Sequence, residues 1–295
     1  MKINILVPSV SSISTDNNGA NVQGDEMVAR AWVRYLARDP RVERAELNGL
    51  EPADACVSFT PFAKGTTGLQ VLYIQNVFPE PEWPGTVEMF ARARPHFDAF
   101  VFPSPGLRDR CCDGLVLQFA VDPEVFYPRP PAELAWPVVF VGNNIRDRET
   151  TERYILACRD QGLVVFGNPA AWNDPVCRGK CSVEAEAAAY SAAGVCLNAH
   201  LREHLEYGSF NFRIFCALAC GGFMVSDWSP HLEAEFGGCL AFTDGGEELR
   251  RVVGHFLKHP HETQPYRDAG RRLVLERHTF AHRMTELVNW LEKKL

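Results

Sequence analysis

Residues 121–144 read VDPEVFYPRPPAELAWPVVFVGNN, and they divide this 295-residue chain into two halves. Five prolines fall within residues 121–137, where neither a helical nor a strand period is present, so this stretch predicts a linker. The apolar run 138–141 then leads into Gly142, which is typical of a buried strand followed by a turn. Two segments of ordinary domain size therefore flank the prolines.

On both sides of these prolines, short β-rich runs alternate with segments of helical periodicity, and this alternation predicts parallel sheets covered by helices. In the first half, the expected strands are residues 3–9, 55–60, 69–76, 99–104 and 115–119, with helices at 28–36 and 86–97. In the second half, the expected strands are residues 138–144, 163–168, 194–200, 223–227 and 239–244, with helices at 150–160, 249–257 and 279–291. Asp244 followed by Glu247 has the form of a capping box before one of these helices.

The resulting prediction is an α/β protein with two Rossmann-like domains that face a cleft. We place the N-terminal domain at residues 1–125, the linker at 126–137 and the C-terminal domain at 138–278, followed by a last helix in 279–295. Open α/β sheets bind ligands beyond the carboxyl ends of their strands, so functional residues are expected directly after the strands.

The composition is that of a soluble globular protein, with 46% hydrophobic and 23% charged residues. No apolar stretch is long enough for a transmembrane helix, and the first residues predict a strand rather than a signal peptide. The formal net charge of −7 argues against a nucleic-acid backbone as the partner. Ten cysteines without zinc-finger spacing indicate reduced thiols and no metal site, and we therefore expect a cytoplasmic protein.

Residues 209–227, SFNFRIFCALACGGFMVSD, carry the clearest functional signal. A polar turn with Ser209 and Asn211 leads into a predicted helix whose first turn contains Arg213, and a buried strand follows. The free backbone N–H groups of a helix N-terminus and a first-turn arginine together favour binding of a diphosphate. The alternative is that Arg213 is a surface cation and that the glycine pair only ends the helix.

This segment also resembles the S-x-N-x-R-x-F-E-x-x-A-C-G-G block of CgeB-like, spore-maturation-type glycosyltransferases, which are similar to the glycosyl transferases of group 1. The similarity continues in residues 121–128 and in a closing motif at 268–288, and it covers most of residues 120–290. The resemblance implies the GT-B fold, a nucleoside diphosphate sugar as co-substrate without any other cofactor, and a last helix that crosses back to the N-terminal domain. It also implies a retaining, metal-independent transfer.

One position departs from the family block, because Cys216 stands where the family has a glutamate after Phe215. In related transferases that glutamate accepts hydrogen bonds from the ribose hydroxyls of the nucleotide. A thiol is a weak acceptor and carries no charge at its ordinary pKa, so the ribose contact is expected to be weaker or to lie elsewhere. The exchange also leaves open a catalytically degenerate protein that only binds a sugar or another protein.

Further donor-side candidates follow the predicted strands 138–144 and 194–200. A glycine turn permits close approach of the backbone, and the resemblance implies that this turn lines the donor phosphates, although a plain strand-to-helix turn explains it equally well. His200 is a candidate catalytic residue or, alternatively, a structural histidine. The donor-side candidates are Gly142, Asn143, Asn144, Arg146, Asn198, Ser209, Asn211, Arg213 and Cys216.

The N-terminal half offers candidates for the acceptor side. Asp25 is a candidate catalytic base, but it equally suits the N-cap or first turn of the helix behind it. Asn18 and Gly19 lie in the polar stretch after the first predicted strand, and Gln75 and Asn76 end another strand.

Together these features predict a glycosyltransferase in which Arg213 and a helix N-terminus stabilise the leaving diphosphate of a nucleoside diphosphate sugar. A nucleotide-sugar epimerase of the same fold and a degenerate binding protein are the alternatives. The acceptor is left open among a glycan, a protein and a small molecule.

Overall fold

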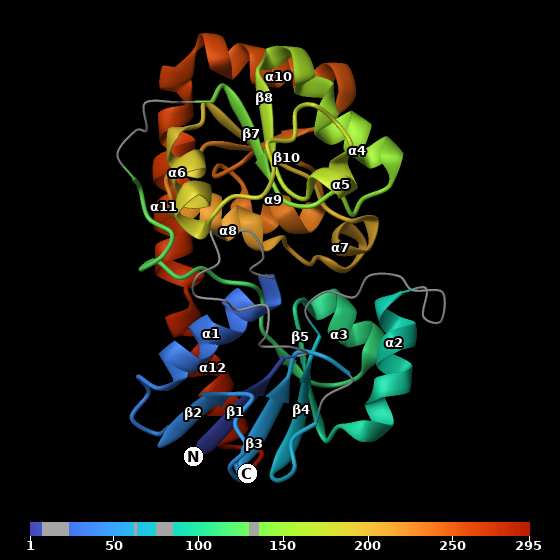
Figure 1. The fold of residues 1–295 in the computed structure, drawn as a ribbon, viewed down its shortest axis with the longest axis vertical. Helices are drawn as coiled ribbons and strands as arrows, with labels where there is room; N and C mark the ends of the chain where they lie inside the picture. Colours follow the sequence, from blue (N-terminus) through green and yellow to red (C-terminus); the bar gives the residue numbers. More distant parts are fainter. Residues whose placement is uncertain (8–23, 62–63, 75–84, 130–135) are drawn as a thin grey trace. The chain divides into compact units, whose positions relative to one another are not determined.

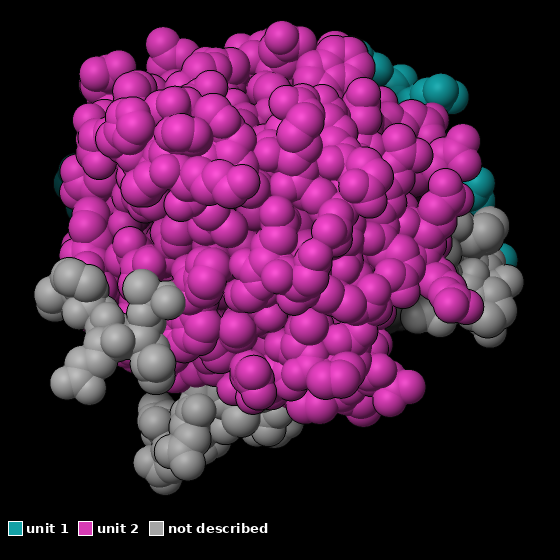
Figure 2. Space-filling view, turned by 90° about the horizontal axis from the view of Figure 1, so that it is seen from above, with its two compact units in different colours: residues 1–17, 21–118, 280–295 teal, residues 18–20, 119–279 magenta. Residues whose placement is uncertain are grey.

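The computed structural model describes residues 1–7, 24–61, 64–74, 85–129 and 136–295. These residues divide into two compact units, which Figure 2 colours separately. Unit 1 contains the described residues up to Gln118 and also Phe280–Leu295, whereas unit 2 contains the described residues from Phe119 to Thr279.

Unit 1 is built on a six-stranded parallel sheet in the order β2-β1-β3-β4-β5-β6 (Figure 1). The inner strands are almost entirely apolar and buried, because helices cover both faces of such a sheet. The strands are β1 (Lys2–Leu6), β2 (Arg44–Leu47), β3 (Ala55–Ser58), β4 (Leu69–Tyr73), β5 (Ala99–Phe102) and β6 (Leu115–Val116). The helices are α1 (Gly24–Leu36), α2 (Thr86–Ala93), the short 3-10 helix Arg94–His96, α3 (Pro105–Cys111) and α12 (Phe280–Leu291).

The last helix, α12, belongs to unit 1 although it follows the whole of unit 2 in the sequence. It packs against α1, where the ring centroids of Tyr35 and Phe280 lie 6.4 Å apart. Arg283 is only 6% exposed and donates a hydrogen bond of 3.0 Å from Nε to the backbone oxygen of Gln118. This buried arginine ties the returning helix to the segment that follows β6.

Unit 2 is built on a five-stranded parallel sheet in the order β11-β10-β9-β7-β8. The strands are β7 (Val138–Val141), β8 (Leu163–Phe166), β9 (Val195–Asn198), β10 (Met224–Asp227) and β11 (Ala241–Thr243). The helices are α4 (Arg148–Tyr154), α5 (Pro169–Trp172), α6 (Val183–Ala192), α7 (Arg202–Tyr207), α8 (Phe212–Ala219), α9 (Pro230–Phe236), α10 (Gly246–Lys258) and α11 (Gln264–Arg277), with 3-10 turns at Leu156–Gln161 and Pro260–Thr263.

The strand order of unit 2 reverses beside β7. From β7 the chain runs outward to β8 on one side, and it then returns to build β9, β10 and β11 on the other side. The carboxyl ends of β7 and β9 therefore flank a topological switch point, which is where open α/β sheets bind ligands. The two parallel sheets confirm the predicted α/β class.

Two local predictions were wrong. The predicted helix 150–160 is divided into α4 and the 3-10 turn that Gly162 ends with a φ of +78°. At the start of α10 the backbone N–H of Asp244 donates to Glu248 at 2.5 Å, so the acid of the capping contact is Glu248 and not Glu247. The N-cap of α10 is Gly245 and not Asp244, so the third helical residue is Glu248. The capping contact therefore lies one residue further along the chain than predicted.

The ten cysteines all fall within the described residues and are free thiols, as predicted. In the described part of the chain, we find no helix that combines the length and the apolar character needed to span a bilayer.

Candidate functional site

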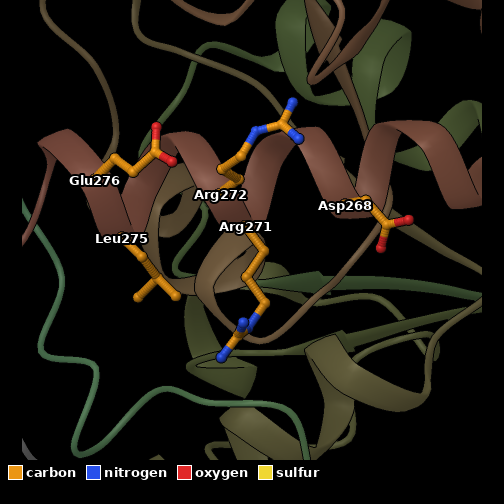
Figure 3. A pocket seen from close by; sticks show the side chains of 5 residues that line it. All are labelled: Asp268, Arg271, Arg272, Leu275 and Glu276. Carbon is orange, nitrogen blue, oxygen red and sulfur yellow. The ribbon is translucent and has the colours of Figure 1, made fainter.

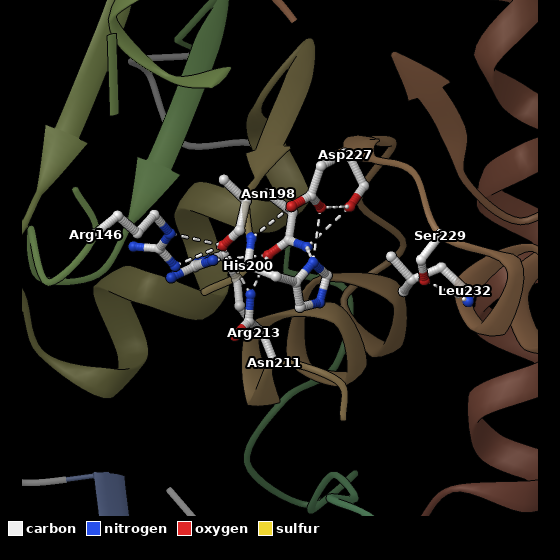
Figure 4. Close-up of polar contacts among 10 residues, drawn as sticks. Arg146, Asn198, His200, Asn211, Arg213, Asp227, Ser229 and Leu232 are labelled. Carbon is white, nitrogen blue, oxygen red and sulfur yellow. Dashed lines mark hydrogen bonds and ion pairs between the residues drawn. The ribbon is translucent and has the colours of Figure 1, made fainter. Parts of the chain in front are cut away.

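Polar side chains of unit 2 converge at the switch point, beyond the carboxyl ends of β7, β9 and β10 (Figure 4). They come from the loop after β7, from the ends of β9 and β10, and from the start of α8. We call this group the switch-point cluster; it consists of Arg146, Asn198, His200, Asn211, Arg213 and Asp227.

Arg213 is held across the end of β7. Its Nε donates to the backbone oxygen of Val141, and its Nη1 donates to Oδ1 of Asn198 at 2.7 Å. The guanidinium lies over the ring of Phe140, 4.2 Å from the centroid. Gly142 has a φ of +149°, and a Cβ at this position would lie 2.4 Å from Nη2 of Arg213, so only glycine leaves room for the guanidinium.

Arg146 places a second cation beside the first. Its Nε donates to the backbone oxygen of Ala199 at 2.8 Å, and its guanidinium lies 5.4 Å from the centroid of the same Phe140 ring. Burial, together with the charge of Arg213, lowers the pKa of Arg146 to about 9. The side chain therefore stays protonated at neutral pH, and two positive charges share one side of the cluster.

The groups that hold these two guanidiniums are neutral. Arg146 and Arg213 donate to the backbone oxygens of Val141, Asn143 and Ala199 and to the amide oxygen of Asn198. Among the described residues neither arginine forms an ion pair with a carboxylate within 4.0 Å. No described carboxylate therefore pairs directly with either guanidinium, which leaves their N–H groups and charge available to a phosphate or diphosphate ligand.

Two asparagines connect the arginines to the start of α8. The buried Asn198 donates from Nδ2 to Ser226 at 2.9 Å, and its Oδ1 also accepts from Nδ2 of Asn211 at 3.1 Å. Asn211 occupies the N-cap position of α8, but its side chain makes no capping hydrogen bond. The positive end of the α8 dipole therefore adds to the charge of Arg213.

His200 and Asp227 form a buried pair at the ends of β9 and β10. The backbone N–H and the Nδ1 of His200 each lie 2.7 Å from an oxygen of Asp227, and Ser226 donates to the same carboxylate at 2.9 Å. Burial alone would raise the pKa of Asp227, but the charge of His200 and these hydrogen bonds lower it. Because Asp227 is ionised, its oxygen accepts a hydrogen bond from the Nδ1–H group of His200, which leaves Nε2 of His200 for another partner.

That Nε2 of His200 is buried and makes no hydrogen bond with any described residue. The Nδ1 of His204 is likewise buried and without a partner in the described ranges, and the two rings lie 6.3 Å apart. Burial, followed by the charges of His200 and Arg146, lowers the pKa of His204 to about 3, so this ring is neutral. Buried imidazole nitrogens that lack a partner are costly and indicate a place for a ligand or a water molecule.

The other donor-side candidates have local partners. The Oδ1 of Asn143 accepts from the backbone N–H of Asn168 at 2.9 Å, and Oδ1 of Asn144 accepts from Thr151 at 2.8 Å. These contacts fix the loop that carries Arg146. The buried Ser209 donates its backbone N–H to the oxygen of His204 at 2.9 Å. Direct contact of these side chains with a donor stays a prediction.

Cys216 lies inside α8 and is fully buried. Burial, together with the nearby Glu186, raises the pKa of this thiol well above its usual range. The thiol is therefore neutral and does not replace the charge of a glutamate.

Asn18, Gly19, Gln75 and Asn76 lie outside the described residues. Asp25 belongs to the first turn of α1, but its side chain is also outside the description. Their acceptor-side roles stay predictions.

Sequence reasoning missed Asp227 and Ser226 as parts of the site. Asp227 and Ser226 end the predicted strand 223–227, so the rule that ligands bind beyond strand ends could have identified them.

A separate hollow lies on α11, where Asp268, Arg271, Arg272, Leu275 and Glu276 line it (Figure 3). All five residues come from this one helix, and the lining contains two arginines and two acidic residues. This mixture favours no anion, so we place the functional site at the switch-point cluster.

Comparison with known proteins agrees with this placement. Residues 148–289 match the family model of glycosyl transferase-like proteins. Residues 148–289 are therefore similar to glycosyltransferases, and they contain every residue of the switch-point cluster except Arg146, which lies two residues before the matched range. The predicted enzyme class is thereby confirmed, whereas the CgeB-like type is not tested at this level.

Solved structures of glycosyltransferases share the fold of both units. Sucrose-phosphate synthase from Thermosynechococcus elongatus is 13% identical, with a TM-score of 0.71 and 100% of each chain covered. Anabaena HepE in complex with UDP and glucose is 12% identical, with a TM-score of 0.69 over 99% of this chain and 100% of that chain. AviGT4, a glycosyltransferase of avilamycin A biosynthesis, is 14% identical, with a TM-score of 0.66 over 99% of this chain and 98% of that chain. At these identities the likeness shows the fold, and it confirms the predicted GT-B architecture. No curated protein sequence matches the chain.

Proposed function

We propose that this glycosyltransferase moves a sugar from a nucleoside diphosphate sugar to an acceptor hydroxyl, and that the switch-point cluster binds the diphosphate of the donor. The observation that carries the proposal is the pair of guanidiniums of Arg146 and Arg213, held by neutral acceptors beside the N-terminus of α8. The presence of UDP and UDP-glucose in structures of HepE supports a uridine nucleotide as the donor.

The chemistry follows from the position of these charges. Negative charge develops on the leaving diphosphate as the glycosidic bond breaks, and cations that are already fixed stabilise it without reorganisation. No described residue accepts a hydrogen bond from Nη2 of Arg213, so this nitrogen has a proton to offer to a phosphate oxygen. His200 presents its unpaired Nε2 to the same ligand, and Asp227 holds the ring in place.

The finer assignments rest on the resemblance and on this charge arrangement. We propose a retaining transfer of the CgeB-like type, which NMR of the anomeric product tests. We also propose that the two arginines supply the positive charge for which other transferases use a divalent ion, so that activity persists in EDTA. Ten free thiols support a cytoplasmic location. We assign acceptor binding to the N-terminal unit, with Asp25 as the proposed base.

Replacement of Arg213 tests the proposal. We expect Arg213→Ala to lower kcat by about 10²–10³, as removal of a transition-state donor does, and to weaken UDP binding about ten-fold or more. Arg213→Lys keeps the charge but loses the fork, so it should recover only part of both. Calorimetry with UDP and transfer assays measure the two effects, and circular dichroism verifies the fold.

The matched control is Arg272→Ala, which removes an exposed arginine of unit 2 on α11. This variant should bind UDP as the wild type does. Equal UDP affinity in Arg213→Ala and Arg272→Ala would remove the switch-point cluster from donor binding.

A further inference from the structure

The proposed donor site lacks one expected group. A nucleoside diphosphate presents two vicinal ribose hydroxyls next to its phosphates, and a carboxylate is a strong acceptor for them. On α8 the residue that follows Phe215 is Cys216, whose buried neutral thiol is a poor acceptor. If this protein binds a nucleotide, the ribose needs an acceptor from another element.

A carboxylate does lie next to this position, on α6. α6 packs against α8, and Glu186 is placed in its first two turns. The hydroxyl of Tyr190, one turn later and fully buried, donates to Oε1 of Glu186 at 2.8 Å. Because the tyrosine ring is fixed by burial, this hydrogen bond also fixes the carboxylate.

Helix packing directs the same carboxylate toward the interior of unit 2, because Glu186 lies one turn before the buried Tyr190 on the same side of α6, and α6 packs against α8 and β7. The charge of Glu186 contributes to the raised pKa of Cys216, and it opposes the lowering of the pKa of Arg213 by burial. Glu186 is therefore near both the residue that replaces the family glutamate and the arginine that we assign to the diphosphate.

One oxygen of this carboxylate is available. Tyr190 occupies Oε1, whereas Oε2 has no hydrogen-bond partner among the described residues, and the side chain as a whole is only half-buried. Burial raises the pKa of Glu186, while the hydrogen bond from Tyr190 and the charge of Arg213 act in the opposite direction. Ligand hydroxyls that donate to Oε2 would further favour the ionised form.

We propose that Glu186 of α6 replaces the missing glutamate of α8 and accepts hydrogen bonds from the ribose hydroxyls of the donor nucleotide. The inference rests on the proposed donor site. It explains how the chain keeps a ribose contact although position 216 is a thiol, and it makes Glu186 a residue that selects ribonucleotides over nucleotides without ribose hydroxyls.

Calorimetry with three ligands tests this role: UDP, 2′,3′-dideoxy-UDP and inorganic pyrophosphate. The wild type should prefer UDP over the dideoxy nucleotide by roughly ten-fold or more, which is the usual range for a hydrogen bond to a charged group. In Glu186→Gln this preference should shrink to about two-fold, while the affinity for pyrophosphate stays that of the wild type. Unchanged pyrophosphate binding also shows that the variant is folded.

Glu184→Gln is the matched control, because Glu184 is an exposed acid of the same helix. It should keep the wild-type preference for UDP. The assignment of Glu186 is overturned if Glu186→Gln keeps the full preference for UDP over the dideoxy nucleotide, or if Glu184→Gln loses this preference to the same extent. Failure of the wild type to bind UDP and pyrophosphate at all contradicts the proposed donor site itself, so the two failures are distinguishable.

Discussion

Replacing Asp227 by asparagine tests how much the buried His200–Asp227 pair stabilises unit 2. The carboxylate is 1% exposed and accepts from the backbone N–H of His200 at 2.7 Å, from Nδ1 of His200 at 2.7 Å and from Ser226 at 2.9 Å. Asparagine keeps one oxygen as an acceptor, but its NH2 group replaces the other oxygen and would face a hydrogen-bond donor of His200 or Ser226. Breaking a buried charged pair costs about 3–5 kcal/mol, so we expect a loss of about 3 kcal/mol in the free energy of unfolding.

The pH dependence of this loss has a defined sign. The pKa of Asp227 is lowered in the folded protein, so the unfolded chain binds more protons near that pH. The carboxylate therefore contributes its full stabilisation above the unfolded-state pKa, about 4, and loses it as the pH falls through the lower folded-state pKa. The difference between Asp227→Asn and the wild type should be constant from pH 7 to pH 5 and should shrink below about pH 4.

Urea denaturation at several pH values, followed by tryptophan fluorescence, measures this difference. Asp160→Asn is the control, because Asp160 is an exposed acid that pairs with Arg250 at 2.6 Å, and its loss should hardly move the midpoint. The reasoning is refuted if the two variants lose the same stability, or if the deficit of Asp227→Asn grows as the pH falls.

Two further predictions concern backbone space and helix attachment. Gly142→Ala places a Cβ 2.4 Å from Nη2 of Arg213 and should weaken UDP binding about ten-fold or more, as measured by calorimetry. The control is Gly179→Ala: Gly179 also has a positive φ, but a Cβ there would meet no atom within 4 Å, so this variant should bind UDP as the wild type does. Equal affinities would show that Arg213 tolerates displacement. Arg283→Met removes the buried guanidinium that donates to the backbone oxygen of Gln118, and it should destabilise unit 1 by about 2 kcal/mol in urea denaturation without changing UDP affinity. An unchanged midpoint would contradict this.

The sequence was sufficient for the architecture because the strands of a parallel sheet are buried on both faces and appear as apolar runs. The strand β2 was missed, since its residues Arg44–Leu47 alternate with charges and pair only with β1 at the edge of the sheet. Short helices such as α7 were missed for a related reason, because five or six residues give too little periodicity to detect.

The site was predictable only in part. Arg213 and Gly142 carry signals of their own, namely a first-turn cation and a glycine at a strand end. The acceptors that orient the arginines are backbone oxygens of Val141 and Ala199, and no side-chain motif marks a carbonyl. Glu186 lies in an alanine-rich helix and enters the site only because α6 packs against α8.

The use of neutral acceptors for two half-buried cations is the feature that best distinguishes a ligand site from a structural ion-pair network. A buried guanidinium loses hydration worth several kcal/mol, and a nearby carboxylate is the usual compensation. Arg146 and Arg213 instead receive carbonyl oxygens, which fix their orientation without cancelling their charge. Fixed charge without a direct ion pair raises the free energy of the empty site, and a bound diphosphate lowers it. Replacing Asn198 by aspartate would therefore stabilise the empty protein and weaken donor binding, whereas a purely structural cluster would gain stability without any change in affinity.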